Sequence, residues 1–150
     1  MPLLPVSHRQ QRQQADCLAT CAAIVLDYLQ VPNDYDRLCQ LLKVRHIGAT
    51  FHNLKQLERL GVTVLVDKGE ETDLRTSVEL GLPPIVFVKT AELPYWDEAL
   101  GHAVVVVGFE DNTIYLNDPA FPDAPKQAPV DEFLLAWIDA DQFYALIRLQ

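Results

Sequence analysis

The first sixty residues have apolar positions at helical spacing. Between residues 16 and 30 these positions run nearly all the way round a helix, which predicts a buried helix whose first turn Asp16 can cap. Pro32 ends that pattern, and Asn33 or Asp34 can cap a second helix. The second helix would carry Tyr35, Leu38, Leu41 and Leu42. A third helix is predicted over 51–60, with Gly61 as its stop.

After Gly61 the pattern changes to short apolar runs that are typical of strands. We expect strands at 62–66, 85–88, 102–109, 113–117 and 143–148, and helices at 71–80 and 130–138. The turn at 110–112 makes the third and fourth strands an antiparallel hairpin, and the four prolines of 119–129 predict a loop. Helices first and antiparallel strands later indicate an α+β fold, and 150 residues suit a single domain over 1–150.

The balance of charges narrows the choice of partners. The chain has 21 acidic and 12 basic residues and a net charge of −9. This balance argues against nucleic acid or an anionic membrane as the main partner, because binding either requires clustered Lys and Arg. The N-terminus lacks the apolar stretch of a signal peptide, and no apolar run reaches the roughly 20 residues of a membrane span. With three cysteines in no framework spacing, we expect reduced thiols and a cytoplasmic protein.

Cys17 is a candidate nucleophile because it follows directly after the predicted helix cap. Backbone N–H groups and the helix dipole at that end favour negative charge, which lowers the pKa of a thiol. Asp16 opposes this effect unless its carboxylate turns aside to cap the helix. The alternative is a buried structural thiol, because free cysteine is among the most buried residue types.

A thiolate nucleophile needs a base, and the base needs an acceptor that orients it. His102 follows Gly101 at the start of a strongly predicted strand, and the hairpin brings it near Asn117 or Asp118. A carboxylate there would hold one imidazole nitrogen while the other faces the thiol. The alternative interpretation is a histidine on an edge strand and an Asp-Pro turn.

Acyl transfer also needs donors for an oxyanion. The Cys17 backbone N–H can supply one, and a side-chain amide can supply the second. The segment before the helix holds four glutamines, and composition does not choose among them. They are Gln10, Gln11, Gln13 and Gln14.

Three segments together resemble the motifs of C39 peptidases, in the family's order. Residues 11–21, QRQQADCLATC, resemble the opening motif of Gln, four residues, an acidic residue and Cys. Residues 101–108, GHAVVVVG, resemble the Gly-His motif, and residues 115–120, YLNDPA, resemble the Asp-Pro motif. The ending at 132–137, EFLLAW, is similar to the family's closing helix.

The resemblance implies a papain-like α+β fold and a bacterial cysteine peptidase acting on a peptide or protein, without a cofactor or metal. It implies Cys17 as nucleophile, His102 as general base and later acid, Asp118 as the orienting group and Gln11 as the oxyanion donor. Two other functions fit the same residues: a peptide-binding module without activity, and an amidase or acyl-transferase on the same fold.

A metal site built on Cys17, Cys21 and His102 is less favoured, because no short paired ligand spacing is present.

Two interpretations fit Tyr95 and Trp96, which precede His102: the aromatic rings either line a substrate groove or pack on the core. The other thiols, Cys21 and Cys39, are interpreted as core residues. The remaining histidines are interpreted as surface or capping residues: His8, His46 and His52.

Overall fold

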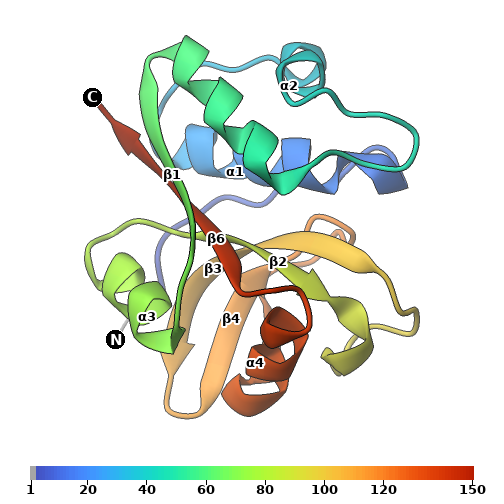
Figure 1. Ribbon diagram of the computed structural model, residues 1–150. Coiled ribbons are helices and arrows are strands. Elements are labelled where there is room, and N and C mark those ends of the chain that lie inside the picture. The colour runs from blue at the N-terminus through green and yellow to red at the C-terminus, as the bar shows by residue number, and fades with distance from the viewer. Residues whose placement is uncertain (1–2) are drawn as a thin grey trace.

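An antiparallel six-stranded sheet separates two layers of helices in the computed structural model, which describes residues 3–150 (Figure 1). The strand order is β1-β6-β2-β3-β4-β5. The strands are β1 (Val62–Lys68), β2 (Ile85–Lys89), β3 (Gly101–Glu110), β4 (Thr113–Asn117), β5 (Lys126–Pro129) and β6 (Phe143–Leu149). The α+β class predicted from the sequence is confirmed.

The helices divide between the two faces of this sheet. They are α1 (Cys17–Tyr28), α2 (Tyr35–Leu41), α3 (Glu71–Glu79) and α4 (Val130–Ile138), with the 3-10 helices η1 (Gln14–Asp16), η2 (Phe51–Leu60) and η3 (Thr90–Glu92). In Figure 1, α1, α2 and η2 lie above the sheet, and α3 and α4 lie below it.

Each face of the sheet has its own apolar core. Alternate side chains of β3 point to opposite faces, as the period of a strand requires. Ala103, Val105 and Val107 pack with α1, whereas Val104 and Val106 pack with α3 and α4. Every residue of 18–26 is buried, because α1 lies between the sheet and the other upper helices.

Two predicted elements differ from the structure. The segment 51–60 is a 3-10 helix, and its apolar residues explain why: Phe51, Leu54, Leu57 and Leu60 recur every three residues, which matches three residues per turn. The proline-rich segment 119–129 is not wholly a loop, because its last four residues form β5. Pro129 is tolerated there because β5 is an edge strand and Pro129 ends it.

The predicted boundaries of the first two helices are close to those observed. The first helix ends at Tyr28, before Pro32, and Gln30 has a positive φ of 61°. Asp34 caps the second helix by accepting a hydrogen bond from the Arg37 backbone N–H at 3.2 Å. No helix within residues 3–150 is long and apolar enough to cross a membrane.

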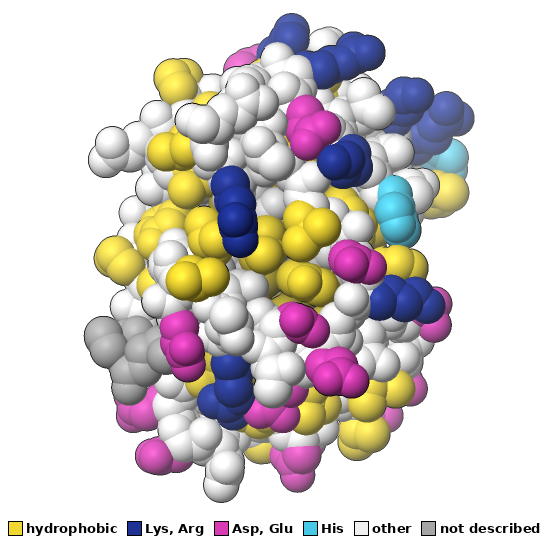
Figure 2. All heavy atoms as spheres, turned by 60° about the vertical axis from the view of Figure 1, so that its left-hand side comes forward, with side chains coloured by type: hydrophobic (Ala, Val, Ile, Leu, Met, Phe, Trp, Pro, Cys, Tyr) yellow, Lys and Arg dark blue, Asp and Glu magenta, His cyan; other side chains and the backbone are white. Residues whose placement is uncertain are grey.

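Charge is distributed unevenly between the two parts of the molecule. Residues 1–60 contain seven Lys and Arg and five Asp and Glu, whereas residues 61–150 contain five and sixteen. Figure 2 shows Lys and Arg mostly over the upper part of one face and Asp and Glu over the lower part. The excess of negative charge therefore lies on residues 61–150, which form the sheet and the helices below it, whereas residues 1–60 have a small excess of positive charge.

Candidate active site

Cys17 is the first residue of α1 and remains partly accessible. The rest of the helix is anchored in the core, so the position of the thiol is fixed by packing one turn away. The end of the helix where Cys17 lies favours negative charge.

Asp16 does not cap this helix with its side chain, contrary to the prediction. Its carboxylate is buried and accepts a hydrogen bond from the Tyr35 hydroxyl at 2.8 Å. The Tyr35 hydroxyl also lies 3.0 Å from the Thr20 hydroxyl, which donates to the Asp16 backbone carbonyl at 2.9 Å. The carboxylate is thus held toward α2. The pKa of Cys39 on that helix is raised, mainly by burial and to a smaller extent by the negative charge of Asp16.

His102 and Asp118 form a buried hydrogen-bonded pair. The pair joins His102 Nε2 to Asp118 Oδ1 at 2.6 Å, and the two side chains are 2% and 0% exposed. The hairpin register places Asn117 opposite Val105, with a bulge between Val106 and Gly108. The Asn117 amide donates elsewhere, to the Val6 carbonyl at 3.3 Å. Of the two predicted acceptors, Asp118 is therefore the one that holds the imidazole.

Tyr95 and Trp96 hold the other oxygen of this carboxylate. The Tyr95 hydroxyl donates to Asp118 Oδ2 at 2.8 Å and the Trp96 indole N–H donates at 2.9 Å. The Ala120 backbone N–H donates to Oδ1 at 3.0 Å. Sequence reasoning named both aromatic residues but missed this role. The available signal was a pair of aromatic hydrogen-bond donors in the segment that leads to His102.

The pKa values of this pair shift in opposite directions. Burial lowers the pKa of His102, but the hydrogen bond and charge of Asp118, together with the nearby Cys17 thiol, outweigh it and raise the pKa to about 9. Burial raises the pKa of Asp118, but its hydrogen bond with His102 and the charge of the imidazolium outweigh it and lower the pKa. The pair is therefore charged at neutral pH.

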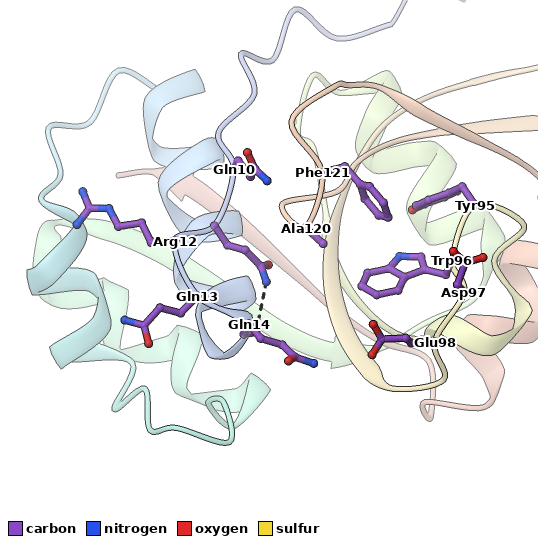
Figure 3. A pocket seen from close by; sticks show the side chains of 11 residues that line it. Gln10, Arg12, Gln13, Gln14, Tyr95, Trp96, Asp97, Glu98, Ala120 and Phe121 are labelled. Carbon is purple, nitrogen blue, oxygen red and sulfur yellow. Dashed lines mark hydrogen bonds between the residues drawn. The ribbon is translucent and has the colours of Figure 1, made fainter.

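A backbone hydrogen bond holds Gln11 next to the segment that follows Asp118. Its backbone N–H donates to the Pro119 carbonyl at 2.7 Å, while its side-chain amide makes only a long 3.4 Å hydrogen bond to the Gln14 carbonyl (Figure 3). Its Oε1 is buried and has no hydrogen-bond partner among residues 3–150. Gln10, Gln13 and Gln14 are exposed, so Gln11 is the half-buried member of the four glutamines.

Two hollows meet at Gln14, which lines both. One, of about 450 Å³, is lined by Cys17 itself, by the 46–49 loop and by Phe87, Leu100 and Gly101. The other, of about 420 Å³, lies between the Gln10–Gln14 segment and the Tyr95–Glu98 segment (Figure 3).

The remaining histidines take three different positions. His8 is half-buried rather than on the surface, and its Nε2 lies 2.7 Å from the Phe121 carbonyl oxygen. His46 is exposed on the rim of the Cys17 hollow. The His52 ring lies edge-on to Phe143 at 4.9 Å between centroids.

The other two thiols differ in burial. Cys21 is a core residue as expected, and burial raises its pKa well above the ordinary value. Cys39 is only partly buried, contrary to its assignment to the core. Within residues 3–150, no group of three or more His, Cys, Asp and Glu side chains is arranged to hold a metal ion.

Comparison with known proteins gives a consistent result. The model of the Peptidase C39 family matches residues 6–140, and no curated protein sequence matches the chain. A C39-like peptidase from Bacillus anthracis has a similar structure, with a TM-score of 0.82, 16% identity, and coverage of 100% of this chain and 99% of that one.

Two further structures come from transporters. A double-glycine-motif protease from an AMS/PCAT transporter, in complex with the leader peptide, has a TM-score of 0.78 at 20% identity and covers 99% of this chain and 94% of that one. The peptidase domain of Streptococcus ComA, a bifunctional ABC transporter, has a TM-score of 0.77 at 21% identity, with coverage of 95% and 97%. These structures share the fold described above.

Proposed function

The chain belongs to the Peptidase C39 family, and from this premise we propose that it is a cysteine peptidase that hydrolyses a peptide bond with Cys17, His102, Asp118 and Gln11. The observation that carries the proposal is the buried His102–Asp118 pair, whose imidazole pKa is raised in part by the nearby Cys17 thiol. The proposal treats residues 1–150 as one peptidase domain that works in the cytoplasm, where thiols stay reduced.

The proposed resting state is a thiolate–imidazolium pair, in which the proton of the Cys17 thiol has passed to Nδ1 of His102, since Nε2 is bonded to Asp118. The raised pKa of His102, about 9, favours this transfer, and Asp118 stabilises the imidazolium that forms. The thiolate then attacks the carbonyl carbon of the scissile bond. A C–S bond forms, and the electron pair of the C=O double bond moves to oxygen.

Gln11 and the Cys17 backbone N–H donate to that oxyanion. The Gln11 amide can turn to it at little cost, because its hydrogen bond to Gln14 is long. The tetrahedral intermediate collapses, the C–N bond breaks, and His102 protonates the leaving amine. Water, deprotonated by His102, then hydrolyses the thioester, and the proton returns to Cys17 as its thiolate leaves.

The test is the pH dependence of iodoacetamide labelling, read by mass spectrometry at each thiol. We expect Cys17 to label fast well below pH 8, and this advantage to be lost in His102→Ala. Cys21, buried with a raised pKa, is the internal control and should label slowly. Labelling of Cys17 at the rate of an ordinary thiol would contradict the proposal.

The same experiment is followed by a search for turnover. A blocked peptide containing Gly-Gly is the first substrate to test, because one protein of similar structure is a double-glycine-motif protease. An activated Cys17 that forms a thioester but passes the acyl group to amines rather than water would identify an acyl-transferase instead.

A further inference from the structure

The hollow between the Gln10–Gln14 and Tyr95–Glu98 segments lies on one side of the proposed reacting atoms. Trp96, which lines it, donates to Asp118 and packs edge-on to His102 at 5.0 Å between ring centroids. Cys17, by contrast, lines the other hollow. The acyl group is bonded to Cys17 in the thioester, whereas the leaving amine takes its proton from His102. The hollow beside Trp96 is thus placed to receive the residues that follow the scissile bond.

Aromatic rings form one wall of this hollow. Phe121 packs edge-on to Tyr95 at 5.4 Å and to Trp96 at 5.3 Å between centroids. A cation already lies against this cluster, because Lys126 Nζ is 4.6 Å from the Phe121 ring centroid and 5.7 Å from that of Tyr95. Ring faces attract a Lys or Arg head group at such distances.

The charged residues that line the hollow also favour a cationic ligand. Asp97 and Glu98 are exposed on the aromatic side, and Figure 3 shows both among the side chains around the hollow. The facing segment offers neutral amides. Its one cation, Arg12, points away from the hollow, with its guanidinium 4.1 Å from the Tyr35 ring centroid and 3.6 Å from Asp36. The lining of the hollow therefore combines aromatic rings with two carboxylates, and its one basic residue is directed away from it.

We propose that this hollow is a subsite for a basic side chain, Lys or Arg, in the segment of the peptide that follows the scissile bond. Asp97 and Glu98 supply the charge that selects it, and Phe121 and Trp96 supply the apolar surface against which its methylene stem lies. This inference rests on the proposed function, because it assigns the direction of the substrate from the roles of Cys17 and His102.

Three blocked hexapeptides test the subsite. Each has Gly-Gly followed by two residues that are both Lys, both Gln or both Glu. The enzymes compared are the wild type, the double variant Asp97→Asn/Glu98→Gln, and a matched control, Glu110→Gln/Asp111→Asn. The control removes the same charge at the β3–β4 turn, roughly 30 Å along β3 from Gly101.

For the wild type we expect KM for the Lys peptide to be about three- to tenfold below that for the Glu peptide at low salt, as for a few exposed ion pairs. The difference should shrink with added salt. It should disappear in Asp97→Asn/Glu98→Gln with kcat for the Gln peptide unchanged, and persist in the control. An equal preference in both double variants, or none in the wild type, would overturn the subsite.

A second readout separates this inference from the proposed function. The same peptides are used to protect Cys17 from iodoacetamide without any need for turnover. Stronger protection by the Lys peptide in the wild type, lost in Asp97→Asn/Glu98→Gln, would support the subsite even if no peptide were cleaved. Equal protection by the Lys and Glu peptides would overturn the subsite even in an active peptidase.

Discussion

The two sides of the proposed active site are held in different ways. On the sheet side, the Asp118 carboxylate is fully buried and accepts four hydrogen bonds, from His102, Tyr95, Trp96 and Ala120. On the helical side, Cys17 is partly accessible. The base is therefore fixed before substrate arrives, while the nucleophile stays open to it. Such fixed polar groups reduce the reorganisation needed during reaction.

The largest effects should come from Cys17→Ala and His102→Ala, which we expect to separate activity from stability. Both should lower turnover by at least about 10⁴, as loss of one member of a catalytic triad does. Only His102→Ala should also cost stability, about 3–5 kcal/mol, because it leaves Asp118 as an unpaired buried charge.

Peptide hydrolysis and urea unfolding measure the two effects. Cys17→Ala is the control for His102→Ala, since its side chain is only partly buried and its loss leaves the buried His102–Asp118 pair intact. If the two variants were equally stable, the expectation that the buried His102–Asp118 pair stabilises the fold would be wrong.

Gln11→Ala should lower kcat by about 10²–10³, the usual effect of removing one oxyanion donor. Its stability should change little, because the Gln11 side chain makes only one long hydrogen bond. Gln10→Ala is the matched control, since Gln10 is an exposed amide on the same segment. An unaffected rate in Gln11→Ala would transfer the donor role to another group.

The contribution of the His102–Asp118 pair to the free energy of unfolding should depend on pH, and this dependence can be measured without a substrate. The pKa of His102 rises from 6.5 to about 9 on folding, so its contribution is complete below pH 6.5 and is lost as pH rises through about 9. The pKa of Asp118 falls below 3.8 on folding, so its contribution is present above that pH and is lost as pH falls through the lowered value.

Urea unfolding at a series of pH values measures both contributions. The loss of stability near pH 9 should be absent in His102→Gln, which keeps a polar side chain but cannot carry the charge. If wild type and variant lose stability equally there, another group titrates, and the pair is not the source.

The parts of the site that sequence could predict depend on local patterns. A continuous β-branched run, a turn and a second run predict the hairpin, and the hairpin brings His102 to the end of β4. The parts that could not be predicted depend on packing between distant segments. Tyr95 and Trp96 reach Asp118 across more than twenty residues of sequence, in a connection with no regular pattern.

The choice among the glutamines shows the same limit. Composition did not choose among the four, and only the resemblance to the opening motif of C39 peptidases singled out Gln11. Its contact with Pro119 depends on packing between distant segments, which no local pattern encodes. The 3-10 helix is the opposite case. The strict spacing of three from Phe51 to Leu60 was present in the sequence, and it indicates three residues per turn rather than 3.6.

The smallest expected effect concerns the helical side of the site, where the thiol is partly accessible. Tyr35→Phe removes the hydroxyl that holds the Asp16 carboxylate toward α2 but keeps the ring on which Arg12 stacks. The freed carboxylate, one residue from Cys17, can then approach the thiol, and a nearby negative charge disfavours the thiolate. We expect the pH midpoint of iodoacetamide labelling at Cys17 to rise by less than about one unit.

Thr20→Val is the matched control for this last measurement, because it removes the neighbouring hydroxyl and leaves the bond between Tyr35 and Asp16 in place. A merely structural role for Tyr35 would change the stability of the protein without moving the midpoint. A midpoint that moves in Tyr35→Phe and not in Thr20→Val would instead identify Tyr35 as the residue that keeps Asp16 from opposing the helix end at Cys17. The helical side would then owe the reactivity of its thiol to the buried hydrogen bond between Tyr35 and Asp16.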